Sequence, residues 1–245
     1  MLHNKTALQK FCVQLLGCSS RLNNMEHKIQ ISPEIKAAAP EYRVILIEAD
    51  VKNSDTPAEL SELIRKWGEN IVSVMEMSDI NKRPGIAATR EVYKKTGKDP
   101  NRYRPSHEQM MRRFFKGQGL YEVSALVDAG NLLSLMSGYS VGVFDADKVK
   151  GETLTVGIGK ADEPYEGVGR GPLNIEGLPV VRDAVGGIGS PTSDNERTKT
   201  SLDTRRIVVT IHVFGEDMPV NDTIALATEL LTKYCMAENI EVCQY

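Results

Sequence analysis

The sequence predicts an α+β fold built as one compact domain. Its 245 residues, 41% of them hydrophobic, can bury a sizeable core. Runs with the period of a strand and runs with the period of a helix both occur, and no repeat, low-complexity segment or linker separates them. We therefore expect a single domain over residues 25–245, preceded by a leader over residues 1–24.

The first elements are two strands and a short helix. Residues 28–31 predict a short strand, residues 33–39 a short helix, and the continuous apolar run 43–49 a buried strand.

Two further helices are expected next. Thr56-Pro-Ala-Glu59 reads as a capping box with proline at the first helical position. Spacings of three, four and seven place one apolar face on the helix behind it: Leu60, Leu63, Ile64, Trp67, Ile71 and Val74. Pro84-Gly85 interrupts the pattern, and residues 86–95 predict a polar helix.

A basic helix beginning near Ser106 and an apolar helix over residues 126–136 come next. The segments between residues 139 and 184 are short strands separated by glycine-rich turns, namely 140–144, 153–158 and 180–182.

The C-terminal part predicts a strand, a helix and a last strand. Residues 206–214 form the strongest strand pattern of the chain, and residues 240–243 the last one. Between them, residues 219–236 predict an amphipathic helix with five side chains inward: Ile224, Leu226, Ala227, Leu230 and Leu231.

The overall charge of the chain argues against a nucleic-acid-binding surface that covers the whole protein. The chain has 30 basic and 33 acidic residues and a net charge of −3, whereas phosphate binding depends on cations. Residues 90–118 are different, because this segment contains nine basic and only three acidic residues, which gives it a local charge of about +6. This patch predicts either a phosphate-binding surface or a solvated helix face.

Neither a metal nor a cofactor is expected. Cys12, Cys18, Cys235 and Cys243 lack the spacing of a zinc site and indicate reduced thiols in a cytoplasmic protein, with Cys235 packed near a helix end. Leu15-Leu-Gly-Cys18 resembles a lipoprotein cleavage box, but the apolar run before it is too short for a signal peptide, and no stretch is long enough to span a membrane.

Three polar positions are candidates for chemistry. His107 follows Ser106, a possible N-cap with Gln109 completing a capping box, and the helix dipole there favours a neutral imidazole. It is either a base or a half-packed surface residue. Asn131 lies in an apolar helix and needs a partner if buried, with Asp128 one turn before it. The pair either contacts a ligand or ties the helix to a loop.

Residues 186–190 form a glycine-rich segment. Glycines let backbone N–H groups approach an oxyanion or a phosphate. No Gly-Lys-Ser/Thr follows, and no dinucleotide fingerprint is present. The segment is either a ligand-binding loop or a turn that leads to the strand at residue 206.

From about residue 102 to 214 the chain resembles the B3/B4 domain of the phenylalanyl-tRNA synthetase beta subunit, and more closely its free-standing relatives. Five stretches carry the resemblance: Arg104-Pro-Ser-His-Glu108, Arg112-Arg-Phe114, Leu126-Val-Asp-Ala-Gly-Asn131, Val143-Phe-Asp145 with Lys148 to Gly151, and Glu196-Arg-Thr198. The resemblance implies mixed or antiparallel sheets flanked by helices around a central cleft. In the synthetase that cleft hydrolyses the ester of tyrosine wrongly attached to the phenylalanine tRNA.

The resemblance implies catalytic positions at Asn131, at the backbone of Gly187, Gly189 and Ser190, and loosely at Glu196, the nearest counterpart of the family's editing glutamate. Substrate-binding positions are Arg104, His107, Arg112, Arg113, Asp128, Gly130 and Gly142. The chain departs from the synthetase in two ways, because Gly142 stands where histidine is usual and the editing glutamate has no clear counterpart. Gly130 stands where the family often has threonine.

Two functions are therefore carried forward. The first is a deacylase that hydrolyses a mischarged aminoacyl-tRNA in trans. The second is a non-catalytic module that binds tRNA or an amino-acid-like ligand. Whether the chain is an enzyme is left open, but it lacks the domains needed to synthesise aminoacyl-tRNA. The expected partners are tRNA, aminoacyl-tRNA or a free amino acid, and neither DNA nor a membrane.

Overall fold

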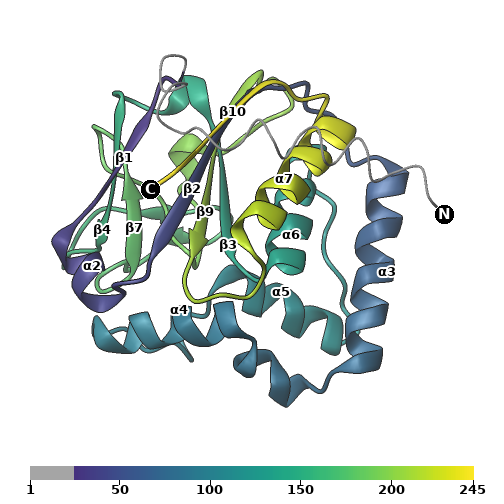
Figure 1. Ribbon diagram of the computed structural model, residues 1–245, viewed down its shortest axis with the longest axis horizontal. Helices are drawn as coiled ribbons and strands as arrows, with labels where there is room; N and C mark the ends of the chain where they lie inside the picture. The colour runs from purple at the N-terminus through teal and green to yellow at the C-terminus, as the bar shows by residue number, and fades with distance from the viewer. Residues whose placement is uncertain (1–24) are drawn as a thin grey trace.

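Two four-stranded sheets pack face to face, and helices cover the outer face of one of them (Figure 1). The computed structural model describes residues 25–245. The predicted leader, the cleavage-box motif, Cys12 and Cys18 lie outside this range.

The first sheet has the order β1-β4-β7-β8, formed by Lys28–Ile31, Thr153–Ile158, Pro179–Arg182 and Gly187–Gly189. Its β1 and β4 are parallel and its other neighbours antiparallel. The second sheet is antiparallel, with the order β10-β2-β9-β3, formed by Glu238–Gln244, Arg43–Asp50, Arg206–Val213 and Ser140–Asp145. A small hairpin pairs β5 (Glu166–Gly167) with β6 (Gly171–Pro172). The expected α+β fold with mixed and antiparallel sheets is confirmed.

The α-helices described are α2 (Pro33–Ala38), α3 (Ala58–Val74), α4 (Pro84–Lys95), α5 (Ser106–Phe115), α6 (Ala125–Ser137) and α7 (Val220–Cys235). Three 3-10 helices accompany them, η1 (Met77–Lys82), η2 (Ala146–Lys148) and η3 (Glu196–Thr198). Among these described helices none is long and apolar enough to cross a membrane.

Side chains that point alternately to the two faces of the second sheet contribute to two cores. Ile45 and Ile47 on β2 face α6 and α7, together with Val209 and Ile211 of β9. The intervening Leu46 belongs to the core between the sheets, which also contains residues of β1, β4, β7 and β8. Because side chains of a strand alternate between faces, one apolar run supplies both layers.

Two predicted capping boxes are wrong. Helix α3 begins at Ala58 after Pro57, without a side-chain cap, because the Thr56 hydroxyl donates to the Asp128 carboxylate instead. Helix α5 has Ser106 as its first residue after Pro105.

The predicted inner face of α3 is also partly wrong. Leu63 and Val74 are 37% and 67% exposed. Leu60, Ile64 and Gly68 are the buried residues. A Cβ atom on Gly68 would lie 2.1 Å from the Phe114 ring, so the helix needs glycine to approach α5 this closely. The burial of Cys235 at the end of α7 is confirmed, and burial raises the pKa of its thiol to about 12.

Candidate functional site

The outer strand β3 lies between the two groups of residues that the sequence assigned to catalysis. Helix α6 covers one face of its sheet, and β8 lies on the other side, in the sheet that faces it. Val143 of β3 has one neighbour on each side. A Cβ atom on Gly130 of α6 would lie 2.8 Å from Val143 Cγ2, and the Val143 N–H donates to the Asp194 carboxylate. Gly130 and Asp194 therefore flank the same position of the edge strand.

The Asp194 carboxyl group lies in a space left by two glycines. A Cβ atom on Gly142 or on Gly189 would lie 3.2 or 3.1 Å from Asp194 Oδ1, and only 2.6 or 2.5 Å from Phe144 Cζ. The Phe144 ring is fully buried between the sheets. Gly142, which stands where the synthetase usually has histidine, is thus needed for the ring and the carboxylate to pack together.

Burial raises the pKa of Asp194 to about 7, although the bond from the Val143 N–H opposes this. Residue Asp194 as a whole is only partly buried, although its carboxyl oxygen Oδ1 is enclosed beside Gly142 and Gly189. A carboxyl group with a pKa near neutral pH is typical of functional sites. Sequence reasoning missed Asp194, and the available signal was an acid five residues after Gly189, just beyond the glycine-rich segment.

The chain around Asp194 is held firmly. Its backbone carbonyl accepts from the Val168 N–H at 3.0 Å, and the carbonyl of Ser193 accepts from the Tyr165 hydroxyl at 2.7 Å and from the Ser190 hydroxyl at 2.9 Å. The Pro191 carbonyl accepts from the Ser106 N–H at 2.7 Å. The position of the carboxylate is therefore fixed by the hairpin β5–β6 and by α5.

The glycine-rich segment is not an open loop. Gly187–Gly189 form strand β8, paired with β7. The Gly186 N–H donates to Asp183 at 3.0 Å and the Ser190 N–H to the Ser193 carbonyl at 3.1 Å. These two amides are therefore occupied by the fold. The catalytic roles of Gly187, Gly189 and Ser190 stay predictions.

Asn131 is partly buried, and its amide has the partner that the sequence placed one turn before it. Its Nδ2 donates to Asp128 at 3.5 Å, a long bond that leaves the amide weakly held. Asp128 is buried and also accepts from the Val123 N–H at 3.0 Å. Burial raises the pKa of Asp128, while the bonds from Thr56, Val123 and Asn131 oppose the rise.

The other predicted acid, Glu196, lies at the start of η3 and forms an ion pair with Lys199. Its carboxylate is therefore engaged at the surface, whereas that of Asp194 faces the glycines.

The basic helix is partly neutralised. Glu108 is fully buried and pairs with Arg90, Arg104 and Arg112. Arg113 lies apart from them, donating to the Gly119 carbonyl at 2.8 Å and lying 4.3 Å from the centre of the Tyr121 ring.

His107, in the first turn of α5, is fully buried and bonds through Nδ1 to Ser140 Oγ at 2.9 Å. The expected neutral imidazole has another cause than the helix dipole. Burial, assisted by the Arg83 cation, lowers the pKa of His107 to about 3. The ring is fully buried in the described structure, and the substrate contact of His107 stays a prediction.

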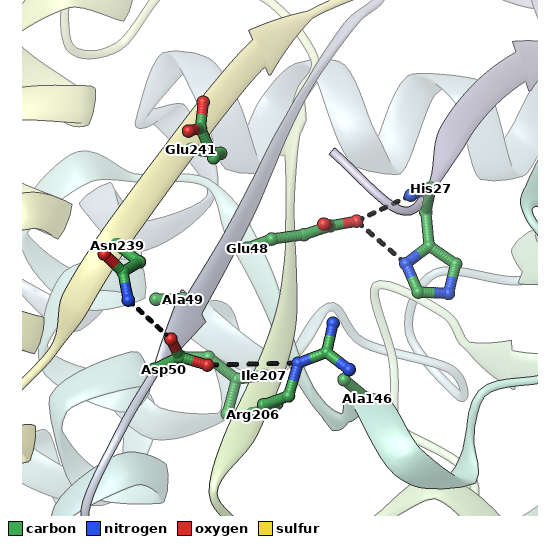
Figure 2. A pocket seen from close by; sticks show the side chains of 9 residues that line it. All are labelled: His27, Glu48, Ala49, Asp50, Ala146, Arg206, Ile207, Asn239 and Glu241. Atoms are coloured by element: carbon green, nitrogen blue, oxygen red, sulfur yellow. Dashed lines mark hydrogen bonds and ion pairs between the residues drawn. The ribbon is translucent and has the colours of Figure 1, made fainter. Parts of the chain in front are cut away.

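Two hollows lie elsewhere on the described surface. One, of about 290 Å³, is polar and lies over β2, β9 and β10, where His27 pairs with Glu48, and Arg206 and Asn239 contact Asp50 (Figure 2). The other, of about 880 Å³, runs along α3 and residues 117–122 and reaches Asp128. Over residues 25–245, no group of three or more histidine, cysteine or acidic side chains could hold a metal ion.

A family model supports the resemblance, and one solved structure is reported with it. An N-terminal fragment of the phenylalanyl-tRNA synthetase beta-subunit from Pyrococcus horikoshii is similar to the chain, with 12% identity and a TM-score of 0.45 over 87% of this chain. The chain covers 50% of that fragment. No curated protein matches. Residues 88–235, more than half of the chain, match the B3/4 domain, and the chain therefore belongs to the B3/4 domain family.

Proposed function

We propose that the protein acts in quality control of charged tRNA by hydrolysing the ester of a mischarged aminoacyl-tRNA in trans. The observation that carries the proposal is the Asp194 carboxyl group, with its pKa raised to about 7 between Gly142 and Gly189. A general base works best when its pKa is near the operating pH. Membership of the B3/4 domain family supports the choice of an ester as the substrate.

In this mechanism the Asp194 carboxylate removes a proton from water as the water oxygen attacks the acyl carbon. The Asn131 amide, bonded to Asp128 at 3.5 Å, lies on the α6 face of β3, opposite to Asp194, and holds the substrate from that side. The tetrahedral intermediate then expels the ribose oxygen, which takes the proton back from Asp194. The products are the free amino acid and the uncharged tRNA.

A second function, binding of tRNA without catalysis, is favoured by one specific observation. Glu108 neutralises only one of the three guanidinium groups around it, so cationic charge remains on α5 and α4. A module that only binds would need this surface and not the Asp194 carboxylate.

Deacylation of a panel of mischarged aminoacyl-tRNAs by the purified protein tests the proposal, with uncatalysed ester loss as the baseline. Acceleration for one amino acid that disappears in Asp194→Asn supports hydrolysis and names the substrate. A flat panel from a folded protein that still binds tRNA refutes hydrolysis and supports the binding module.

A further inference from the structure

The guanidinium groups around Glu108 form an ordered cationic cluster, made of Arg90, Arg104 and Arg112 and called here the Glu108 cluster. Glu108 Oε2 lies 2.9 Å from Arg90, and Oε1 lies 2.9 Å from Arg112 and 3.4 Å from Arg104. Glu108 is fully buried, so solvent does not compete for it. Three cations on one anion leave the cluster with a net charge of +2.

Two of the three arginines are fixed by further bonds. Arg90 donates to the Pro100 carbonyl at 3.0 Å and to the Asn101 amide at 2.7 Å. Arg112 donates to Asn81 at 3.0 Å. These groups are 12% and 24% exposed, and their donors are largely used within the fold. Their part is to supply charge.

Arg104 differs from them. Its side chain is 42% exposed, and its Nε atom is buried without a hydrogen-bond partner among the described residues. Its guanidinium is thus placed by charge attraction to Glu108, while its terminal nitrogens remain available. A planar guanidinium with free donors is suited to bidentate contact with a phosphate. Beside it, Gln109 donates to the Arg104 carbonyl at 2.6 Å and accepts from Arg170 at 2.6 Å, which adds a further cation from the turn between β5 and β6.

We infer that Arg104, oriented by buried Glu108 and supported by Arg90 and Arg112, binds a phosphate group. The inference rests on the proposed function in taking an RNA phosphodiester as the source of that group. Arg104 is the contact residue and Glu108 a positioning residue, which acts by holding the guanidinium groups in place.

Binding of an unacylated tRNA transcript as a function of salt concentration tests the contact. Arg104→Gln should bind about tenfold more weakly than the wild type, with a salt dependence about one unit shallower, because one phosphate contact is lost. Arg65→Gln is the matched control. It removes the same charge from an exposed arginine of α3 that pairs with Glu62 and Glu69. If Arg104→Gln binds tRNA no more weakly than Arg65→Gln, an RNA phosphodiester as the ligand of Arg104 is ruled out.

Glu108→Gln separates positioning from charge. It makes the protein more cationic, so long-range attraction alone predicts tighter binding. If Glu108 positions Arg104, binding weakens instead, in a variant shown to be folded by circular dichroism. Tighter binding would refute the positioning role, and an unfolded variant would leave the decision to Arg104→Gln.

Titration with inorganic phosphate alone shows whether Arg104 binds a free phosphate or the phosphodiester of an RNA. Loss of phosphate binding in Arg104→Gln with unchanged tRNA affinity would overturn RNA as the source but retain the site. The proposed hydrolysis is tested independently. A flat deacylation panel with tRNA binding that depends on Arg104 removes only the hydrolysis, and accelerated ester loss with binding indifferent to Arg104 removes only the phosphate site.

Discussion

Replacing Asp194 by asparagine should stabilise the protein at high pH and abolish its hydrolytic activity. Asparagine keeps the shape of the side chain and can still accept from the Val143 N–H, but it carries no charge. The two effects have one cause, since the fold holds a carboxyl group in a place that disfavours its ionised form.

The magnitude follows from proton linkage. The pKa of Asp194 is 3.8 as a reference and about 7 in the fold. The unfolded chain therefore releases this proton first as pH rises, so the contribution of Asp194 to the free energy of unfolding falls between about pH 4 and pH 7 and is level above that. Three pKa units correspond to about 4 kcal/mol. Because the residue is partly exposed, we expect Asp194→Asn to raise the free energy of unfolding by about 1–3 kcal/mol at pH 8, and by much less at pH 5.

Urea unfolding at pH 5 and pH 8, followed by fluorescence of Trp67, measures this difference. The wild type and the variant share all histidines, so their difference isolates Asp194. Asp203→Asn, at an exposed position, is the control and should change stability at neither pH. In the deacylation assay, Asp194→Asn should lower kcat by roughly 10²–10⁴-fold, and the wild-type rate should rise with an inflection near pH 7. A variant less stable than the wild type at both pH values would show that the carboxylate is stabilised by the fold, and would refute the reasoning.

Three other substitutions have defined outcomes. Gly142→Ala should lower the free energy of unfolding by about 1–3 kcal/mol because its Cβ would meet the Phe144 ring; Gly186→Ala, which meets nothing within 4 Å, is the urea-unfolding control. Asn131→Ala should abolish deacylation while leaving tRNA affinity unchanged, and an unchanged rate would remove Asn131 from the mechanism. The contribution of His107 to the free energy of unfolding should fall on acidification from pH 6.5 towards pH 3, because an unfolded histidine takes up a proton that buried His107 does not. Denaturation at pH 7 and pH 4.5 measures this fall in the free energy of unfolding, which should be smaller in His107→Gln than in the wild type by up to about 2–3 kcal/mol. An equal fall in both proteins would contradict the burial argument.

Local pattern predicts the elements of this fold well and their ends less well. The apolar runs at 43–49 and 206–214 become the central strands β2 and β9, since period and burial agree there. The caps at Thr56 and Ser106 failed because the competing partners, Asp128 and the Pro191 carbonyl, come from distant segments. Propensity does not encode such partners, which tertiary contacts supply.

The site shows the same limit more sharply. Gly142 and Gly189 were marked from the sequence, but the reason for them, the Phe144 ring and the Asp194 carboxylate, depends on two sheets packing together. Charge counting gave residues 90–118 about +6, yet it could not show that one buried glutamate gathers three of the arginines. Arg104 and Arg112 looked equivalent in sequence, and only burial and hydrogen bonding separate the exposed contact from its support.

The two proposed sites are joined by one short segment. Residues 190–194 begin beside β8 and end at the catalytic candidate Asp194, and on the way the Pro191 carbonyl accepts from the first N–H of α5. The Thr192 hydroxyl also donates to the Tyr103 carbonyl at 3.5 Å, next to Arg104. A phosphate held at Arg104 would therefore be fixed relative to the carboxylate through backbone hydrogen bonds. Binding energy from a remote group accelerates a reaction only when it is used to place the reacting atoms. For this reason an aminoacyl ester without phosphates should be hydrolysed with a reduced kcat as well as a raised KM, whereas independent sites would change KM alone.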